Sequence, residues 1–295
     1  MRWPEGFIGV DWGTTNRRAY RIDGGGQPVD EFEDGRGVLS VEGGGFPAAV
    51  AAIRDRLGDL PMLMGGMIGS NRGWIEAPYV PSPAGLDDLA GQLVWAEPER
   101  TAIVPGVSLL SGSRADVMRG EEVQLLGAVA EGAIPPDCTV CHPGTHNKWV
   151  TVRDARIAEF RTVMTGELFN LLKEKSILSD LLARPATPGE AFLDGVRHGL
   201  GGDILTAELF SVRARVLLGA AEASDAASYT SGLLIGADVR SGLASAREEE
   251  IVVMGRPELT RLYADALGVA GRTAREFDGE RAFIAGIKCI AERIA

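Results

Sequence analysis

The alternation of apolar and polar positions divides the chain into the strands and helices of an α/β protein. Residues 7–23 read as an apolar strand, a polar Gly-Thr-Thr turn and a second alternating stretch. Glycines 24–26 break the chain before another strand-like stretch, so the N-terminus is predicted to form a β-hairpin or meander. Apolar residues at helical spacing predict a helix over residues 47–57, and residues 62–64 predict a short buried strand.

The second half of the chain repeats this opening. Residues 138–141 are strand-like, a Pro-Gly-Thr-His turn follows at 143–146, and a second strand-like stretch covers 148–152. A strand, a Gly-Thr turn and another strand therefore occur near the start of both halves. The remaining pattern predicts helices at 121–131, 167–182, 186–199, 207–218 and 259–267, and a buried strand at 251–255.

The length of the chain predicts two domains. At about 150 residues per domain, 295 residues exceed the usual size of one domain. A Pro-Gly step lies within residues 103–107 and marks the expected end of the first domain. We therefore expect one domain at 1–107 and a second at 108–295.

Composition and charge exclude several classes of function. The formal net charge is −11, which argues against partners such as nucleic acid or an anionic membrane. No apolar run approaches the roughly 18 residues of a membrane span, and the N-terminus lacks the apolar core of a signal peptide. Three cysteines favour a reducing, cytoplasmic setting. The 39 glycines, about twice the average share, fall mainly in loops that border apolar runs, as expected near a ligand.

The first Gly-Thr turn carries the chemistry of a phosphate site. Asp11 ends a strand, where a carboxylate can hold a hydrated Mg²⁺. Gly13 allows backbone N–H groups to approach phosphate oxygens, and the hydroxyls of Thr14 and Thr15 add donors. The alternative is an ordinary Asp-Gly hairpin turn with incidental threonines.

The second turn favours the phosphate interpretation. It holds Gly144, Thr145, His146 and Lys148 in the same position after a strand. Two such turns, one in each half, suit a polyphosphate. The chain has no Gly-x-x-x-x-Gly-Lys-[Ser/Thr] sequence, so a P-loop enzyme is not indicated.

These paired turns resemble the phosphate-binding elements of the sugar kinase/Hsp70/actin superfamily. Within it, five segments resemble the 2-dehydro-3-deoxygalactonokinase family, and together they span nearly the whole chain. The five are residues 9–16, 66–74, 116–122, 142–149 and 232–236, of which the middle three are the most specific. The resemblance implies an actin-like ATPase fold of two ribonuclease H-like domains, with ATP in the cleft between them.

The glycine-rich loop at 66–74 is the expected sugar-acid site. The guanidinium of Arg72 can grip a carboxylate in a bidentate pair. Ser70 and Asn71, next to Gly69, offer hydrogen bonds to sugar hydroxyls, and Trp74 offers an apolar wall. From the residues alone, a plain surface loop is the alternative; the resemblance favours the substrate site.

The candidates for the catalytic base lie where a helix begins. Acidic residues at a helix start often only complement the helix dipole. Kinases of the resembled superfamily, however, place a catalytic carboxylate after a glycine at such a helix start. Gly120-Glu121 has this setting, although the usual residue there is Asp. The base therefore stays open between Glu121, which we favour, and Asp116, which we expect in a loop.

The adenosine contacts are expected near the C-terminus. Gly255 and Arg256 form a strand-to-helix turn that can contact adenosine, and Gly236 is expected to border the same pocket. The plain alternative is an ordinary βα loop.

These expectations combine into one reading of the chain. The resemblance implies an ATP- and Mg²⁺-dependent kinase, and we expect it to phosphorylate the 6-hydroxyl of 2-dehydro-3-deoxy-D-galactonate in D-galactonate degradation. The rivals are a kinase for the C4 epimer, 2-dehydro-3-deoxy-D-gluconate, and a non-catalytic sensor or nucleotide switch. The sequence leaves open the epimer preference and the oligomeric state, a homodimer included.

Overall fold

The computed structural model describes residues 2–247 and 250–294. By its contacts the chain divides into two compact units. The first comprises Met1–Asp137, Val152–Glu159 and Gly279–Ala295, and the second comprises Cys138–Thr151 and Phe160–Asp278. This division differs from the expected boundary at residue 107, because residues 108–137 and the C-terminal helix pack with the first unit.

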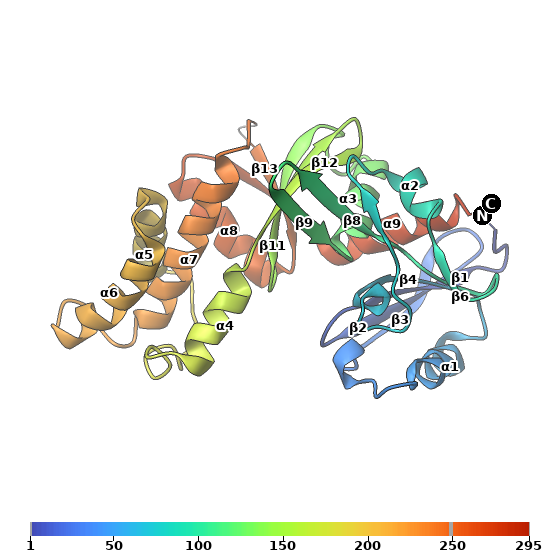
Figure 1. Ribbon diagram of the computed structural model, residues 1–295, viewed down its shortest axis with the longest axis horizontal. Coiled ribbons are helices and arrows are strands. Elements are labelled where there is room, and N and C mark those ends of the chain that lie inside the picture. The colour runs from blue at the N-terminus through green and yellow to red at the C-terminus, as the bar shows by residue number, and fades with distance from the viewer. Residues whose placement is uncertain (1, 248–249, 295) are drawn as a thin grey trace. The chain divides into compact units, whose positions relative to one another are not determined.

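A mixed six-stranded sheet forms the centre of the first unit (Figure 1). Its order is β3-β2-β1-β4-β7-β6, with β1 antiparallel to β2 and parallel to β4. Apolar residues of α1 pack against one side of this sheet, as the predicted helix requires. The elements are β1 (Phe7–Trp12), β2 (Arg17–Ile22), β3 (Pro28–Asp34), α1 (Phe46–Leu57), β4 (Met62–Gly66), β6 (Val94–Glu97) and β7 (Thr101–Ile103).

A small sheet and three helices complete the first unit. The sheet has the order β5-β8-β9, in which β8 and β9 form an antiparallel hairpin. Helices α3 and α9 pack against each other at a pair of glycines, Gly127 and Gly286. The elements are β5 (Tyr79–Pro81), α2 (Leu86–Ala90), β8 (Gly106–Ser111), β9 (Arg114–Met118), α3 (Glu121–Ala130) and α9 (Gly279–Ala291).

The second unit repeats the strand order of the first. Its sheet runs β12-β11-β10-β13-β14, so a central strand again lies between its hairpin partner and two later strands parallel to it. The strands are β10 (Cys138–His142), β11 (Asn147–Arg153), β12 (Arg156–Val163), β13 (Glu250–Gly255) and β14 (Thr273–Asp278). The helices are α4 (Thr165–Lys175), α5 (Glu190–Gly201), α6 (Leu205–Leu217), α7 (Ala226–Leu243) and α8 (Pro257–Val269).

The helix predicted over 167–182 ends early, at Lys175. The Ser176 hydroxyl donates to the Leu172 carbonyl (2.5 Å) and accepts from the N–H of Leu178 (2.9 Å), which turns the chain out of the helix. The sequence analysis predicts no helix at α7 or α9. Both helices are largely buried in the structure.

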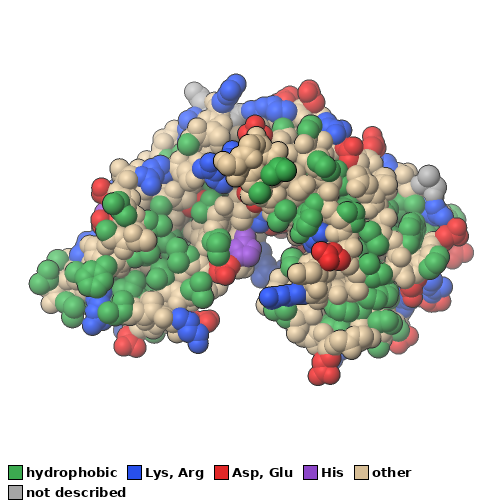
Figure 2. All heavy atoms as spheres, viewed as in Figure 1, with side chains coloured by type: hydrophobic (Ala, Val, Ile, Leu, Met, Phe, Trp, Pro, Cys, Tyr) green, Lys and Arg blue, Asp and Glu red, His purple; other side chains and the backbone are tan. Residues whose placement is uncertain are grey.

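Helix α6 leaves part of its apolar surface exposed. Figure 2 shows hydrophobic side chains gathered over this helix, at the left of the view. The exposed residues on and beside it are Ile204, Phe210, Leu217 and Leu218. In the described part of the chain, no helix is both long and apolar enough to cross a membrane.

Candidate active site

The first Gly-Thr turn is held in place by a short 3₁₀ segment. The N–H of Gly37 donates to the Thr15 carbonyl (2.9 Å), and the N–H of Val38 donates to the Gly13 carbonyl (3.0 Å). The side chains of Thr14 and Thr15 are exposed. The turn therefore has a fixed backbone and presents two hydroxyls, as a phosphate site requires.

Two glycines bring the end of β1 close to the start of α3. Gly66 ends β4 at φ 91°, and a Cβ there would lie 2.8 Å from the Trp12 carbonyl oxygen and 3.3 Å from Asp11 Oδ1. Gly120 precedes α3 at φ 107°, and a Cβ there would lie 3.2 Å from the Gly66 Cα. Both glycines adopt a backbone that other residues avoid. The structure thus brings Asp11 and the segment before Glu121 together across Gly66.

The two candidate bases lie in different secondary-structure elements. Glu121 begins α3, and its carboxylate accepts the N–H of Arg119 (3.1 Å) beside the Gly66 contact. Asp116 lies in β9, paired with Leu109 of β8, and its Oδ1 accepts the N–H of Val117 (2.8 Å). The expectation that Asp116 lies in a loop is wrong, because the hairpin extends to Met118.

The neighbour of Glu121 is a fully buried carboxyl group. Both oxygens of Glu122 accept the N–H of Gly120, at 2.9 and 2.7 Å. Burial, together with the negative charge of Glu121, raises the pKa of Glu122 to about 8, and the bonds from Gly120 lower it only in part. Glu122 is therefore mainly protonated at pH 7 and has a structural role in this pair.

The glycine-rich loop is compact and braced by its own backbone. The Ser70 hydroxyl donates to the Met67 carbonyl (2.7 Å) and accepts the N–H of Arg72 (3.2 Å). The side chains of Asn71 and Arg72 are exposed. Trp74 packs against the core of the first unit. Asn71 and Arg72 are thus presented outward, whereas Ser70 and Trp74 shape the loop.

The second Gly-Thr turn lies against the N-terminus of α4. The N–H of Glu167 donates to the Thr145 carbonyl (2.9 Å), and a Cβ on Gly166 would lie 2.5 Å from the Gly144 carbonyl oxygen. A helix N-terminus carries a partial positive charge and favours anions. This end of α4 therefore adds to the positive potential at the turn.

The polar side chains of this turn are anchored nearby. The imidazole of His146 bonds the carboxylate of Glu167. Lys148 is buried, and its ammonium group donates to the His146 carbonyl (3.3 Å). Both residues therefore stabilise the turn, and Lys148 also supplies positive charge to it.

Asp238 of α7 joins the elements that surround the second turn. Its carboxylate accepts four bonds, from Asn147 (2.8 Å), Trp149 (2.7 Å), Thr165 (2.5 Å) and Tyr263 (2.5 Å). Burial raises the pKa of Asp238 above its usual range, although these bonds lower it in part. Sequence reasoning missed this residue, because nothing in the pattern of α7 marks one polar position as buried.

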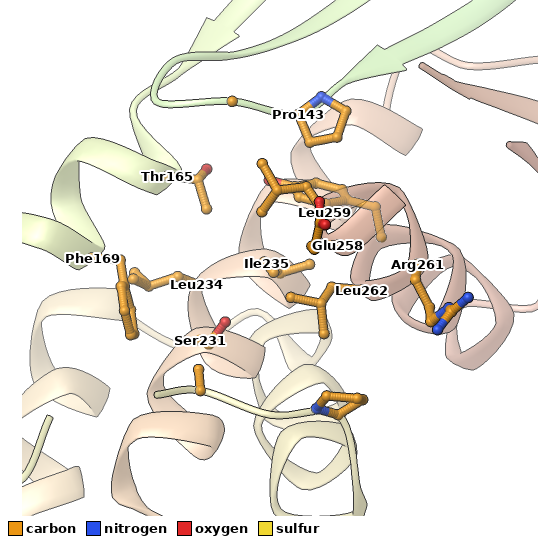
Figure 3. A pocket seen from close by; sticks show the side chains of 15 residues that line it. Pro143, Thr165, Phe169, Ser231, Leu234, Ile235, Glu258, Leu259, Arg261 and Leu262 are labelled. Atoms are coloured by element: carbon orange, nitrogen blue, oxygen red, sulfur yellow. The ribbon is translucent and has the colours of Figure 1, made fainter. Parts of the chain in front are cut away.

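A cavity of about 550 Å³ opens beside the second turn (Figure 3). Figure 3 shows Phe169 and Leu234 on one side of it, Ile235 and Leu262 in the middle, and Pro143 above. The described lining is Pro143, Gly144, Thr165, Gly166, Phe169, Ala186, Pro188, Ser231, Leu234, Ile235, Glu258, Leu259, Arg261, Leu262 and Tyr263. A mainly apolar cavity next to a Gly-Thr turn of this kind has the chemistry that a nucleoside requires.

The residues expected to contact adenosine lie near this cavity in different ways. Gly255 lies beside Pro143, since a Cβ there would be 3.5 Å from the Pro143 carbonyl oxygen. Arg256 precedes α8, which lines the cavity, and its side chain is exposed. Gly236 instead faces α5, where a Cβ would lie 2.4 Å from the Val196 carbonyl oxygen. Leu234 and Ile235, which come just before Gly236 in α7, do line the cavity.

Asp11 fits the demands of a Mg²⁺ ligand. Mg²⁺ keeps several waters and binds proteins through one or two carboxylates. Asp11 lies at a strand end and is partly exposed, and because Gly66 has no side chain, no Cβ from that position crowds the Oδ1 atom of Asp11. A separate cluster of His198, Asp203 and Glu208 lies at the junction of α5 and α6, where the His198 Nε2 and Glu208 Oε2 atoms are 2.9 Å apart.

A comparison with protein families now identifies the chain. The family described as 2-keto-3-deoxy-galactonokinase matches residues 11–290. The chain belongs to this kinase family. A 2-dehydro-3-deoxygalactonokinase from Escherichia coli (strain K12) is 36% identical over 292 residues, which cover 98% of either chain. The family resemblance of the sequence motifs is thereby confirmed.

Solved structures confirm the fold. A Sinorhizobium meliloti protein provisionally assigned as 2-dehydro-3-deoxygalactonokinase superposes with a TM-score of 0.91 at 35% identity, over 98% of this chain and 99% of that one. Component A of (R)-2-hydroxyglutaryl-CoA dehydratase from Acidaminococcus fermentans matches at a TM-score of 0.53 and 12% identity, over 98% and 99% of the two chains. The likeness to this second protein shows the actin-like ATPase fold alone.

The raised pKa of Glu122 predicts a specific pH dependence of stability. Its folded pKa of about 8 lies above its ordinary value of 4.5, so the folded state binds one more proton between these limits. The free energy of unfolding should therefore fall as pH rises from 5 to 8. Glu122→Gln removes this contribution, and urea denaturation should show several kcal/mol less pH dependence over that interval. Parallel curves for the two proteins would contradict the assignment.

Removing Asp238 should destabilise the second unit. Asp238→Ala leaves four buried donors without their acceptor, and we expect the free energy of unfolding to fall by at least about 3 kcal/mol. Asp265→Ala is the matched control, because this carboxylate of α8 is exposed, and it should change stability by about 0.5 kcal/mol or less. Urea denaturation measures the free energy of unfolding of both variants. If both lost the same amount, the four hydrogen bonds to Asp238 would not stabilise the protein more than an exposed carboxylate does.

Proposed function

We propose that this chain transfers the γ-phosphoryl group of MgATP to the 6-hydroxyl of 2-dehydro-3-deoxy-D-galactonate. The observation that carries the proposal is its membership of the 2-keto-3-deoxy-galactonokinase family over residues 11–290. The Escherichia coli relative, which bears the corresponding enzyme name, matches along nearly its full length. The reaction would belong to the degradation of D-galactonate.

The nucleotide is proposed to bind through both Gly-Thr turns. Gly13, Thr14 and Thr15 would offer donors to its phosphates from the first turn, and residues 144–148 from the second. Asp11 would hold Mg²⁺, which when bound neutralises charge on the phosphate oxygens. The cavity lined by α4, α7 and α8 would take the adenosine, with Gly255 and Arg256 at its edge.

The sugar acid is proposed to bind at the loop that begins at Gly66. Arg72 would pair with its carboxylate, and Asn71 would reach a hydroxyl, because both side chains are exposed. Gly69 and Ser70 would give the loop its shape, and Trp74 would support it from the core. Glu121 would accept the proton of the 6-hydroxyl, because it begins α3 beside the Gly66 contact, whereas the neighbouring Glu122 is fully buried and accepts the N–H of Gly120.

The partner proposed besides substrates is a second copy of the chain. The exposed apolar residues of α6 are Phe210 and Leu217, with Ile204 and Leu218 at its ends. Contiguous exposed apolar surface is typical of protein interfaces. A homodimer that buries this face would account for its exposure in one copy.

A coupled assay of ADP release tests the function. We expect ATP turnover to depend on the sugar acid and to be faster with 2-dehydro-3-deoxy-D-galactonate than with its C4 epimer, 2-dehydro-3-deoxy-D-gluconate. Faster turnover of the epimer would assign the chain to the rival substrate. ATP hydrolysis that ignores every sugar acid would instead indicate a nucleotide switch.

The choice of base is tested with two isosteric variants. Glu121→Gln keeps the shape of the side chain and removes its basicity, so kcat should fall at least about a hundredfold while the sugar KM changes little. Asp116→Asn should reduce kcat less and act through a lower melting temperature, because Asp116 lies in a hairpin strand. Normal turnover of Glu121→Gln beside a folded, inactive Asp116→Asn would assign the base to Asp116.

A further inference from the structure

Arg119 carries buried hydrogen-bond donors that lack an acceptor. Its side chain and backbone together are only 9% exposed. Among the side-chain atoms of residues 2–247 and 250–294, its Nε and Nη1 are the two buried nitrogens without a partner. Leaving a buried charged donor unpaired is costly, and native proteins rarely do so. An acceptor is therefore missing from this place in the first unit.

The guanidinium is fixed on one side and faces the substrate loop on another. Its Nη2 donates to the Ala77 carbonyl (2.7 Å), and its Cζ lies 4.3 Å from the centre of the Tyr79 ring. A Cβ on Gly69 would lie 2.8 Å from Nη1. The unpaired Nη1 thus lies directly beneath the backbone of the loop proposed to bind the sugar acid, at a residue without a side chain.

The same residue is connected to the proposed base. The backbone N–H of Arg119 donates to the Glu121 carboxylate, whereas the long side chain carries the guanidinium away toward Gly69. The substrate has its carboxylate and its reacting 6-hydroxyl at opposite ends of a six-carbon chain. The Arg119 guanidinium and the Glu121 carboxylate are separated by the length of one arginine side chain. This separation matches that of the carboxylate and the 6-hydroxyl of the substrate.

We propose that Arg119 is a specificity-determining residue that hydrogen-bonds the carboxylate of the sugar acid from beneath the Gly66–Trp74 loop. This inference rests on the proposed function and adds a second, buried cation to the exposed Arg72. A small displacement of the loop at Gly69 opens the unpaired donors to the ligand. Because the guanidinium is charged and buried, an uncharged analogue forms a weaker bond there than the carboxylate does.

The test compares the sugar acid with its C1 carboxamide in the coupled assay. In Arg119→Met, kcat/KM for the acid should fall at least about thirtyfold, whereas that for the carboxamide should fall less than about threefold. The KM for ATP should stay unchanged, and Arg119→Lys should recover part of the preference for the acid. If Arg119 had a purely structural role, Arg119→Met would reduce turnover of the acid and of the carboxamide equally. Its melting temperature would fall as well.

Glycine variants test the same contact with Arg119 in place. Gly69→Ala puts a methyl group against Nη1 and should also reduce the preference for the acid. Gly43→Ala is the matched control, because a Cβ at Gly43 meets nothing within 4 Å, and it should behave as the wild type. If Arg119→Met fails to fold, Gly69→Ala and Arg119→Lys decide the question.

The outcomes separate the two proposals. A wild-type protein that turns over no sugar acid overturns the proposed function, and this inference with it. A wild-type protein that is active, together with Arg119 and Gly69 variants that keep the full preference for the acid, overturns only the role of Arg119.

Discussion

The close approach of Gly66 to Gly120 is the constraint on which the first unit's site depends. Each glycine adopts a positive φ, and a Cβ on Gly120 would lie 3.2 Å from the Gly66 Cα. Through this contact the end of β4 is close both to Asp11 and to the start of α3. Any side chain at either position would separate Asp11, the proposed metal ligand, from the candidate base, because these backbones leave no room for one.

The start of α3 also shows how a buried acid can be tolerated. Glu122 receives the N–H of Gly120 on both oxygens, yet burial and the charge of Glu121 keep it mainly protonated at pH 7. Glu122 is thus mainly protonated and structural, whereas the Glu121 carboxylate, at the start of the helix, accepts the N–H of Arg119. The positive φ of Gly120 makes this possible, since it turns the N–H back toward the helix.

The second unit stabilises its Gly-Thr turn by a different means. There a single carboxylate, Asp238, accepts bonds from β11, α4 and α8, so the strand after the turn and the helix that packs on the turn share one anchor. In the second unit, four hydrogen bonds to Asp238 hold the elements together. In the first unit, the close approach of Gly66 and Gly120 does so. The apolar cavity lies between the same helices, so the anchor fixes both the turn and the proposed nucleoside pocket.

Local patterns in the sequence were enough for the α/β class, both Gly-Thr turns and the start of α3 at Glu121, because each depends on residues within a few positions of one another. Helix α7 was missed because it is buried on nearly every side, which removes the periodic polar face by which a helix is found. Gly236 fits α7 against α5, while Leu234 and Ile235, just before it in the sequence, line the cavity.

Tertiary structure alone decided the buried contacts of Asp238 and Arg119. It also decided the cavity and the assignment of residues 108–137 and α9 to the first unit. Each depends on contacts between segments far apart in the chain, such as Asp238 with Asn147 or Arg119 with Ala77. The charge state of a polar group and its hydrogen-bond partners depend on how deeply the group is buried. Burial is set by the surrounding tertiary structure and not by the residue type.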